Sequence, residues 1–146
     1  MEIKFRIMND DDLCKVIDLC NLCFDENTSI EYAKNVYEKT KSDSNQIYVL
    51  GEMNGEIVAH LKITIIPTIY EHMNTYAILN HVCVKPEYRR HRLATKMLKY
   101  TEEICKEKNC VCMELWSKNF RTAAHACYKD YGFIIEDAPF FSKKVD

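Results

Sequence analysis

Segment 82–95 constrains the fold of this chain most strongly. It runs from a β-branched strand through a turn at Pro86 into a basic loop, and the loop opens directly into an amphipathic helix. Backbone N–H groups at a helix start have no intrahelical partner, and the helix dipole adds positive potential there. A basic loop at this place therefore predicts a binding site for a phosphate or pyrophosphate group.

Two other interpretations of the basic loop remain open. Its residues could form a solvated helix start or part of a nucleic-acid-binding patch; they are Arg89, Arg90, His91 and Arg92. The net charge of the whole chain is −2 at pH 7, and no second basic cluster is present. This charge balance disfavours nucleic acid, so we expect no nucleic-acid partner.

The bulk composition is that of an ordinary globular domain. The chain has 146 residues, of which 47% are hydrophobic and 29% charged, and this length suits one domain over 1–146. No apolar run approaches the roughly 18 residues that a membrane span requires, and the N-terminus does not resemble a signal peptide. We therefore expect a cytoplasmic protein that does not enter a membrane.

A second segment, 121–133, supports the phosphate-binding interpretation. It places an alanine, a tyrosine, a glycine and a phenylalanine at the spacing Ala-x3-Tyr-x3-Gly-Phe. Together the two segments resemble the two signatures of the GNAT superfamily of N-acetyltransferases. The matching positions are Arg89, Leu93, Ala94, Ala124, Tyr128, Gly132 and Phe133.

The resemblance implies an α/β (α+β) fold. The expected architecture is a single GNAT-like domain whose central sheet is mixed and mostly antiparallel. Six to seven strands are expected in this sheet, flanked by about four helices. The expected order of elements is β-α-α-β-β-β-α-β-α-β-β.

The hydrophobic periodicity supplies the elements of the first half. Alternation at residues 3–7 predicts a half-buried strand, and Leu13, Val16, Ile17 and Cys20 form the buried stripe of a helix. Ser29 predicts the start of a second, shorter helix. Strands are expected at 47–53 and from residue 57 to Pro67, joined by the Asn54-Gly55 hairpin turn.

The second half alternates strands and helices. Strand 76–84 is apolar on both faces, and a helix follows the basic loop. A buried strand is expected at 111–116 and a helix at 121–131, which Gly132 should end. Terminal strands are expected at 133–136 and 140–144.

The resemblance implies acetyl-CoA as cosubstrate. Main-chain groups of Val82, Cys83 and Val84 would bind the pantetheine arm and the thioester. The loop would bind the pyrophosphate through Arg89, Arg90, His91, Arg92, Leu93, Ala94 and Thr95. Arg92 stands where the family motif has its first glycine, and it could either add a charged contact or crowd the loop.

The resemblance also implies direct acetyl transfer to a primary amine. Tyr128 matches the tyrosine that protonates the departing thiolate; the alternative is a core tyrosine on an amphipathic helix. The base is open. Asn80 occupies the usual position and could hold a water, whereas strand alternation predicts a buried structural role for His81. Cys83 as a covalent acyl carrier is disfavoured.

Acceptor specificity is expected from the first two helices and from loops. Acidic and aromatic residues there suit a small cationic amine, although the same residues are also ordinary solvated loop residues: Asp25, Glu26, Tyr32 and Glu71. A non-catalytic acyl-CoA sensor is the main alternative function. A homodimer is possible.

The eight cysteines follow no framework spacing. Cys20-x-x-Cys23 and Cys110-x-Cys112 could be drawn as a zinc site, but the first pair lies within a helix and the second within a strand. We therefore expect no metal, and thiols that are reduced and mostly packed in the core.

Overall fold

The structure is a computed structural model that describes residues 2–146. Contacts within the chain divide it into two compact units, one up to Trp116 and one comprising Ser117–Asp146. Each unit is described separately below. That residues 1–146 form one N-acetyltransferase domain stays a prediction.

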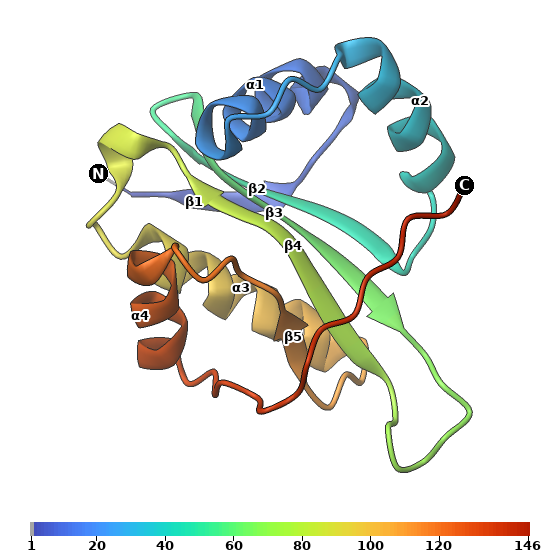
Figure 1. Ribbon diagram of the computed structural model, residues 1–146. Helices are drawn as coiled ribbons and strands as arrows, with labels where there is room; N and C mark the ends of the chain where they lie inside the picture. The colour runs from blue at the N-terminus through green and yellow to red at the C-terminus, as the bar shows by residue number, and fades with distance from the viewer. Residues whose placement is uncertain (1) are drawn as a thin grey trace. The chain divides into compact units, whose positions relative to one another are not determined.

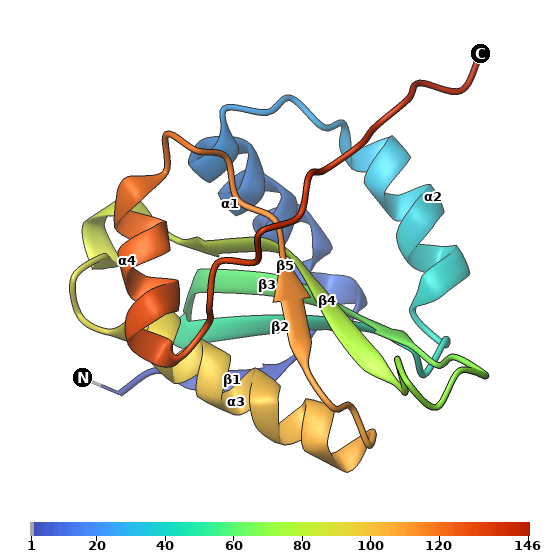
Figure 2. The ribbon, with the colours of Figure 1, turned by 60° about the horizontal axis from the view of Figure 1, so that its bottom comes forward.

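The first unit is built on a mixed five-stranded sheet. Its strands are β1 (Lys4–Ile7), β2 (Gln46–Met53), β3 (Glu56–Ile66), β4 (Tyr76–Val84) and β5 (Met113–Leu115). They follow one another in sequence order across the sheet (Figures 1 and 2). All neighbours pair antiparallel except β4 and β5, which are parallel. The predicted mixed, mostly antiparallel sheet is therefore confirmed.

The turn between β2 and β3 follows from its two residues. Asn54 and Gly55 have φ angles of 52° and 78°, the left-handed conformation that a two-residue hairpin turn requires and that these residues adopt readily. Gly51 meets a different demand. A Cβ atom at this position would lie 2.8 Å from the side chains of Ile3 and Phe5, so β1 can approach β2 only because no side chain stands there.

Three helices cover the two faces of the sheet. Helices α1 (Leu13–Phe24) and α2 (Ile30–Thr40) lie on one face, and α3 (Leu93–Glu107) lies on the other (Figure 1). The Ser29 hydroxyl caps α2 by accepting a hydrogen bond from the Tyr32 N–H, as predicted. The best-buried side chains lie on the strands and on α3: Val49, Leu50, Val58, Leu61, Ile63, Leu79, Met97, Leu98 and Thr101.

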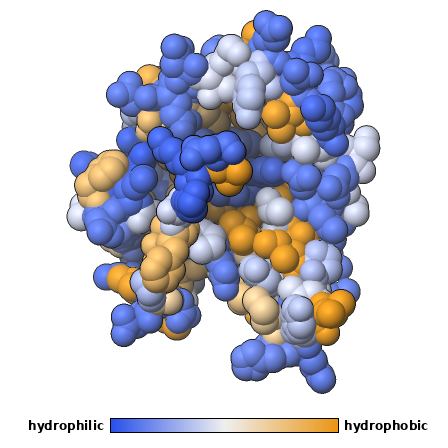
Figure 3. All heavy atoms as spheres, turned by 45° about the vertical axis from the view of Figure 1, so that its right-hand side comes forward, coloured by the Kyte–Doolittle hydropathy of each residue, from blue (hydrophilic) through white to orange (hydrophobic). Residues whose placement is uncertain are grey.

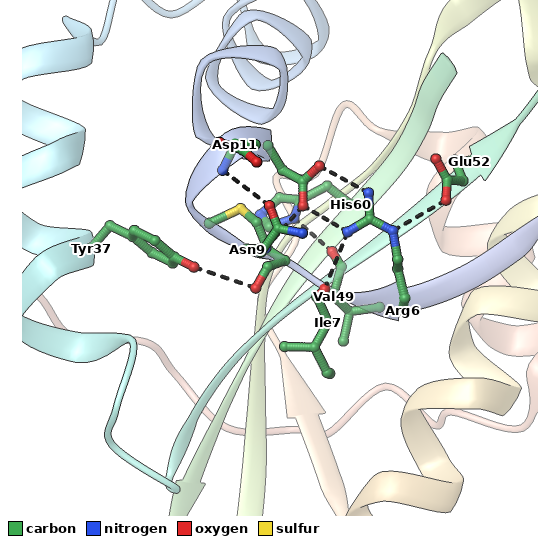
Figure 4. Close-up of polar contacts among 10 residues, drawn as sticks. Arg6, Ile7, Asn9, Asp11, Tyr37, Val49, Glu52 and His60 are labelled. Carbon is green, nitrogen blue, oxygen red and sulfur yellow. Dashed lines mark hydrogen bonds and ion pairs between the residues drawn. The ribbon is translucent and has the colours of Figure 1, made fainter. Parts of the chain in front are cut away.

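An ion-pair cluster joins β1 to the start of α1. The Arg6 guanidinium donates two hydrogen bonds to Asp12, at 2.6 and 2.9 Å, and one of 3.1 Å from Nε to Glu52 on β2 (Figure 4). The hydrogen bond from Arg6 holds the pKa of Asp12 below its ordinary value despite the opposing effect of burial. Glu52 therefore has a structural partner in the Arg6 guanidinium.

The second unit contains α4 (Thr122–Tyr131). Gly132 ends it with a φ of 122°, and the N–H groups of Gly132 and Phe133 donate to the Tyr128 carbonyl at 3.1 and 2.9 Å. The predicted glycine stop is thus confirmed. It brings the rings of Tyr128 and Phe133 to 5.8 Å, edge to face.

The expected number of strands is wrong. Within residues 2–146 the sheet has five strands rather than six to seven, because 133–136 and 140–144 form neither strand nor helix. Aromatic and β-branched residues favour a strand, but a strand also needs a hydrogen-bonded neighbour, and Pro139 has no N–H to donate. Large apolar side chains in this stretch are exposed, among them Ile134, Ile135, Phe140 and Phe141.

The strand predicted at 111–116 also differs. Only Met113–Leu115 pair with β4, and Val111 and Trp116 are exposed rather than buried. The loop between β3 and β4 likewise exposes Ile69, Tyr70 and Met73. Figure 3 shows orange hydrophobic atoms at the surface between blue hydrophilic ones. Among the described helices, none combines the length and the apolarity that crossing a bilayer requires.

Candidate active site

Strand β4 contains a bulge at His81. On β3, His60 pairs with Cys83 and Lys62 pairs with Asn80, so Leu61 alone faces the two residues His81 and Val82. The extra residue lies at His81, whose φ of 53° is left-handed. A β-bulge of this kind interrupts the alternation of side chains and redirects the bulged one.

The bulge overturns the prediction of a buried His81. The imidazole is 46% exposed, and its Nε2 lies 3.1 Å from Oε1 of Glu26, in the loop after α1. Its ring also meets the ring of Phe24 edge to face, with centroids 4.9 Å apart. Asn80, the preceding residue, is exposed as well. Both base candidates of β4 therefore reach the surface at one place.

His60 is the buried structural histidine instead. Its side chain is 4% exposed, and Nδ1 lies 2.7 Å from the Val49 carbonyl oxygen (Figure 4). Burial lowers the pKa of His60 to about 4. His60 is therefore uncharged at neutral pH.

Cys83 is buried and flanked by the thiols of Cys20 and Cys23 from α1. Hydrogen bonds with these thiols, together with burial, raise the pKa of Cys83 well above its ordinary value. A thiol that is not ionised is a poor nucleophile. This chemistry argues against an acyl-cysteine intermediate.

The cysteine pairs that suggested a zinc site have different neighbours. Cys20 and Cys23 lie against Cys83, whereas Cys110 lies against Cys105. In the part of the chain that the structure describes, no group of three or more His, Cys, Asp or Glu side chains is arranged to hold a metal ion.

The start of the basic loop is fixed by Glu56, a residue that the sequence analysis missed. Oε1 of Glu56 pairs with Lys85, and Oε2 accepts a 2.7 Å hydrogen bond from the Tyr88 hydroxyl. The two carboxylate oxygens thus contact the residue before the η2 turn (Pro86–Tyr88) and the last residue of this turn. The hydrogen bond from Lys85 lowers the pKa of Glu56. Nε of Arg89 then donates to the Val84 carbonyl at 2.9 Å, which folds this arginine back against the end of β4.

The rest of the loop has the conformation that the glycine of the family motif would permit. Arg90 and Arg92 have φ angles of 70° and 60°, and α3 begins at Leu93. Left-handed backbone costs a non-glycine residue about 1–2 kcal/mol. Arg92 therefore has a strained backbone where glycine would not be strained. Its side chain is exposed and lies beside the helix start.

The start of α3 suits an anion. Its first intrahelical hydrogen bond is from the Lys96 N–H to the Arg92 carbonyl, and Arg92, the N-cap residue, makes no side-chain hydrogen bond to the helix start. Arg90, His91 and Arg92 are all exposed around this end, and no described residue bonds their side chains. A helix start without an N-cap side chain, its dipole and three exposed basic side chains together fit a pyrophosphate.

The predicted site residues fall into both units. The first unit brings together Asn80 and His81 at the bulge, and Val82, Cys83 and Val84 lead from it into the loop 89–95. Of the three, Cys83 and Val84 are buried and Val82 is half-buried, so they can offer main-chain groups rather than side chains. Tyr128 is half-buried on α4 in the second unit, and its role stays a prediction.

The overall fold is that of known acetyltransferases. A putative acetyltransferase from Agrobacterium tumefaciens superposes with a TM-score of 0.87 at 19% identity, covering 97% of this chain and 99% of its own. Glucosamine-6-phosphate N-acetyltransferase from Arabidopsis thaliana gives 0.81 at 19% identity over the whole of both chains. An aminoglycoside 6'-N-acetyltransferase from Acinetobacter haemolyticus gives 0.79 at 21% identity, again over both whole chains.

The sequence itself carries the family signature. No curated protein matches the chain closely enough to count as a relative. The sequence model of the acetyltransferase (GNAT) family matches residues 13–133, which include β4, the basic loop, α3 and α4. The predicted resemblance is confirmed: this chain belongs to the GNAT acetyltransferase family.

Proposed function

We propose that the protein is an acetyl-CoA-dependent N-acetyltransferase that acts on the primary amine of a small molecule. The observation that carries the proposal is the uncapped start of α3 behind three exposed basic residues, in a member of the GNAT family. Arg92 supports it further, because this residue keeps the strained left-handed backbone that such a loop needs.

The loop would hold the two phosphates through N–H groups of the segment from Arg90 to Thr95. Arg92 and Arg90 would add charge, since neither guanidinium is engaged by a described residue. Main-chain groups of Val82 and Val84 would align the pantetheine arm. When bound, acetyl-CoA supplies the acetyl group as a thioester. The same residues would bind acetyl-CoA in a non-catalytic sensor, so turnover has to be tested separately.

Direct transfer fits the environment of Cys83. Its buried, un-ionised thiol is unsuited to carry the acetyl group, so the amine would attack the thioester in one ternary complex. Tyr128 would protonate the departing thiolate, the role of general acid that its family position implies. The proton of the amine would leave towards the bulge of β4, where Asn80 and His81 are exposed.

We further propose that the two units belong to one N-acetyltransferase domain. The family match supports this, because residues 13–133 span the boundary at Trp116. The acceptor would be a small amine, as the names of two structural neighbours indicate for those proteins.

The test is calorimetric titration with acetyl-CoA, with desulfo-CoA and ATP as comparisons. We expect micromolar binding of acetyl-CoA and of desulfo-CoA, and weak binding of ATP. Release of free thiol is then followed with spermidine, glucosamine 6-phosphate and tobramycin as acceptors. Binding without thiol release would support a sensor, and absence of binding would refute both functions.

A further inference from the structure

We propose that His81 accepts the proton of the acceptor amine and that Glu26 positions its imidazole for this step. The inference rests on the proposed acetyl transfer and names its base. The pair joins two elements that are 55 residues apart in the sequence, the bulge of β4 and the loop after α1.

The hydrogen bond decides which ring nitrogen is free. A carboxylate only accepts hydrogen bonds, so Nε2 of His81 carries the hydrogen that bonds Oε1 of Glu26 at 3.1 Å. In the neutral ring the other nitrogen, Nδ1, then has a free lone pair. Within residues 2–146 no group bonds Nδ1, and the ring is 46% exposed. His81 is therefore held as a base with its accepting atom open to solvent.

The loop that carries Glu26 is braced from inside. Asp25 ends α1 in a left-handed conformation, with a φ of 50°. The side-chain amide of Asn21 then bonds Thr28 in both directions, at 3.1 and 3.0 Å, and the Asn21 carbonyl accepts from the Glu26 N–H at 3.1 Å. Three hydrogen bonds thus fix the loop backbone on both sides of the carboxylate.

The groups that contact or interact with His81, apart from Glu26, carry no charge at neutral pH. Phe24 packs on the ring and carries no charge. His60 on β3 is the other titratable group that interacts with His81, and it is buried and uncharged at neutral pH. The Glu26 carboxylate is therefore the acidic group in direct contact with the His81 ring.

The proton balance of the transfer is as follows. Nδ1 of His81 takes one proton from the ammonium form of the acceptor, which frees the nitrogen lone pair. The N–C bond forms, the C–S bond breaks, and CoA leaves as a thiolate that takes the Tyr128 proton. The second proton lost by the nitrogen returns through water to the Tyr128 phenolate, and His81 passes its proton to solvent.

The kinetic test compares four variants with the wild type, using the fastest of the three amines above as acceptor. His81→Gly suits the left-handed backbone, and we expect it to lower kcat about 100-fold, with recovery when imidazole is added. Glu26→Gln should lower kcat about 10-fold, and Glu26→Asp less, because the carboxylate only orients the ring. Glu107→Gln is the matched control: it makes the same carboxylate-to-amide change at the exposed end of α3, so kcat should stay within about twofold.

Two further readouts separate a positioning role from a structural one. The acidic limb of the pH profile of kcat/KM should be present in the wild type and absent in His81→Gly. Nitrogen-15 NMR should show the Nε2–H tautomer of His81 in the wild type and a mixture in Glu26→Gln, whatever the acceptor.

Unchanged kcat in His81→Gly, or the same tautomer in Glu26→Gln, would overturn the inference. Measurements on the wild type separate this result from failure of the proposed function. The acetyl-CoA dissociation constant should be the same in all variants. A wild type that binds no acetyl-CoA, or that binds it without releasing thiol, would refute acetyl transfer itself.

Discussion

His60 and His81 lie on neighbouring strands and have opposite environments. His60 is buried on β3, bonded to the Val49 carbonyl, and its pKa is lowered to about 4. His81 is exposed on β4 and bonded to Glu26. The first therefore contributes to the packing of the sheet, and the second is available to an acceptor. What separates them is one extra residue in β4.

The difference shows how a β-bulge can change which side chains of a strand are exposed. Strict alternation would send His81 to the face opposite Asn80. The pairing of Lys62 with Asn80 and of His60 with Cys83 leaves two β4 residues opposite Leu61, and the side chain of His81 turns outward. The same interruption exposes Asn80 and His81 next to the residues proposed to align the thioester.

Removing the proposed proton donor of the leaving thiolate gives the largest expected effect. Tyr128→Phe should lower kcat by about 100-fold or more, because the thiolate then leaves without a proton donor. The acetyl-CoA dissociation constant should stay within about twofold. The measurement is steady-state kinetics across pH, together with calorimetry.

The pH profile of Tyr128→Phe also tests whether His81 is the base. If His81 is the base, the acidic limb of the pH profile of kcat/KM persists in Tyr128→Phe and only the alkaline limb changes. Normal turnover with weakened acetyl-CoA binding would instead remove Tyr128 from the acid role.

The second prediction concerns pH and stability. Because the pKa of His60 is about 4 in the folded protein against 6.5 ordinarily, the unfolded chain takes up the proton first as pH falls. The contribution of His60 is thus complete above about pH 6.5 and is lost towards pH 4. It should amount to about 3 kcal/mol of the free energy of unfolding. Urea denaturation at several pH values measures it.

The matched control is His60→Leu, which has no imidazole to titrate. The difference in free energy of unfolding between wild type and His60→Leu should shrink as the pH falls from 6.5 to 4. A difference that does not change with pH would mean that His60 is not buried as an uncharged ring.

The features that distinguish the two histidines could be predicted only in part from the sequence. The Asn54-Gly55 turn, the Ser29 cap and the Gly132 stop are local signals, and all three are confirmed. The bulge at His81 is not local, since it depends on how β3 and β4 pair. The contact with Glu26 likewise joins residues far apart in the chain, and no spacing rule predicts it.

The loop and the terminal strands illustrate the same limit. Arg92 stands at a glycine position of the family motif, and its φ of 60° is a conformation that glycine adopts readily. No sequence signal predicts the contacts of Glu56 with Lys85 and Tyr88, because they depend on the β2–β3 hairpin lying beside the basic loop. Residues 133–136 and 140–144 begin with aromatic and β-branched residues that favour strands, but this composition alone provides no hydrogen-bonded neighbour.

The third prediction is a smaller loss of stability at neutral pH. His60→Leu removes the hydrogen bond to the Val49 carbonyl and leaves that buried oxygen with one partner fewer. The free energy of unfolding should fall by about 1–3 kcal/mol, while kcat stays within about twofold. Thermal unfolding and thiol release measure the two. A large loss of kcat in the folded variant would break the division of roles between His60 and His81.

The smallest expected effect tests whether strained backbone is kept for ligands. His81 and Arg92 are both left-handed, but Glu26 and Phe24 hold His81, and no described residue bonds the Arg92 side chain. Arg92→Gly should therefore stabilise the protein by about 1 kcal/mol, whereas Arg92→Ala keeps the strain and should not. Both variants lack the guanidinium, so equally weakened acetyl-CoA binding in both would show that the charge binds phosphate. Tighter binding in Arg92→Gly alone would show that the arginine crowds the loop, and Arg92 would then be a poor substitute for glycine rather than a ligand-binding residue.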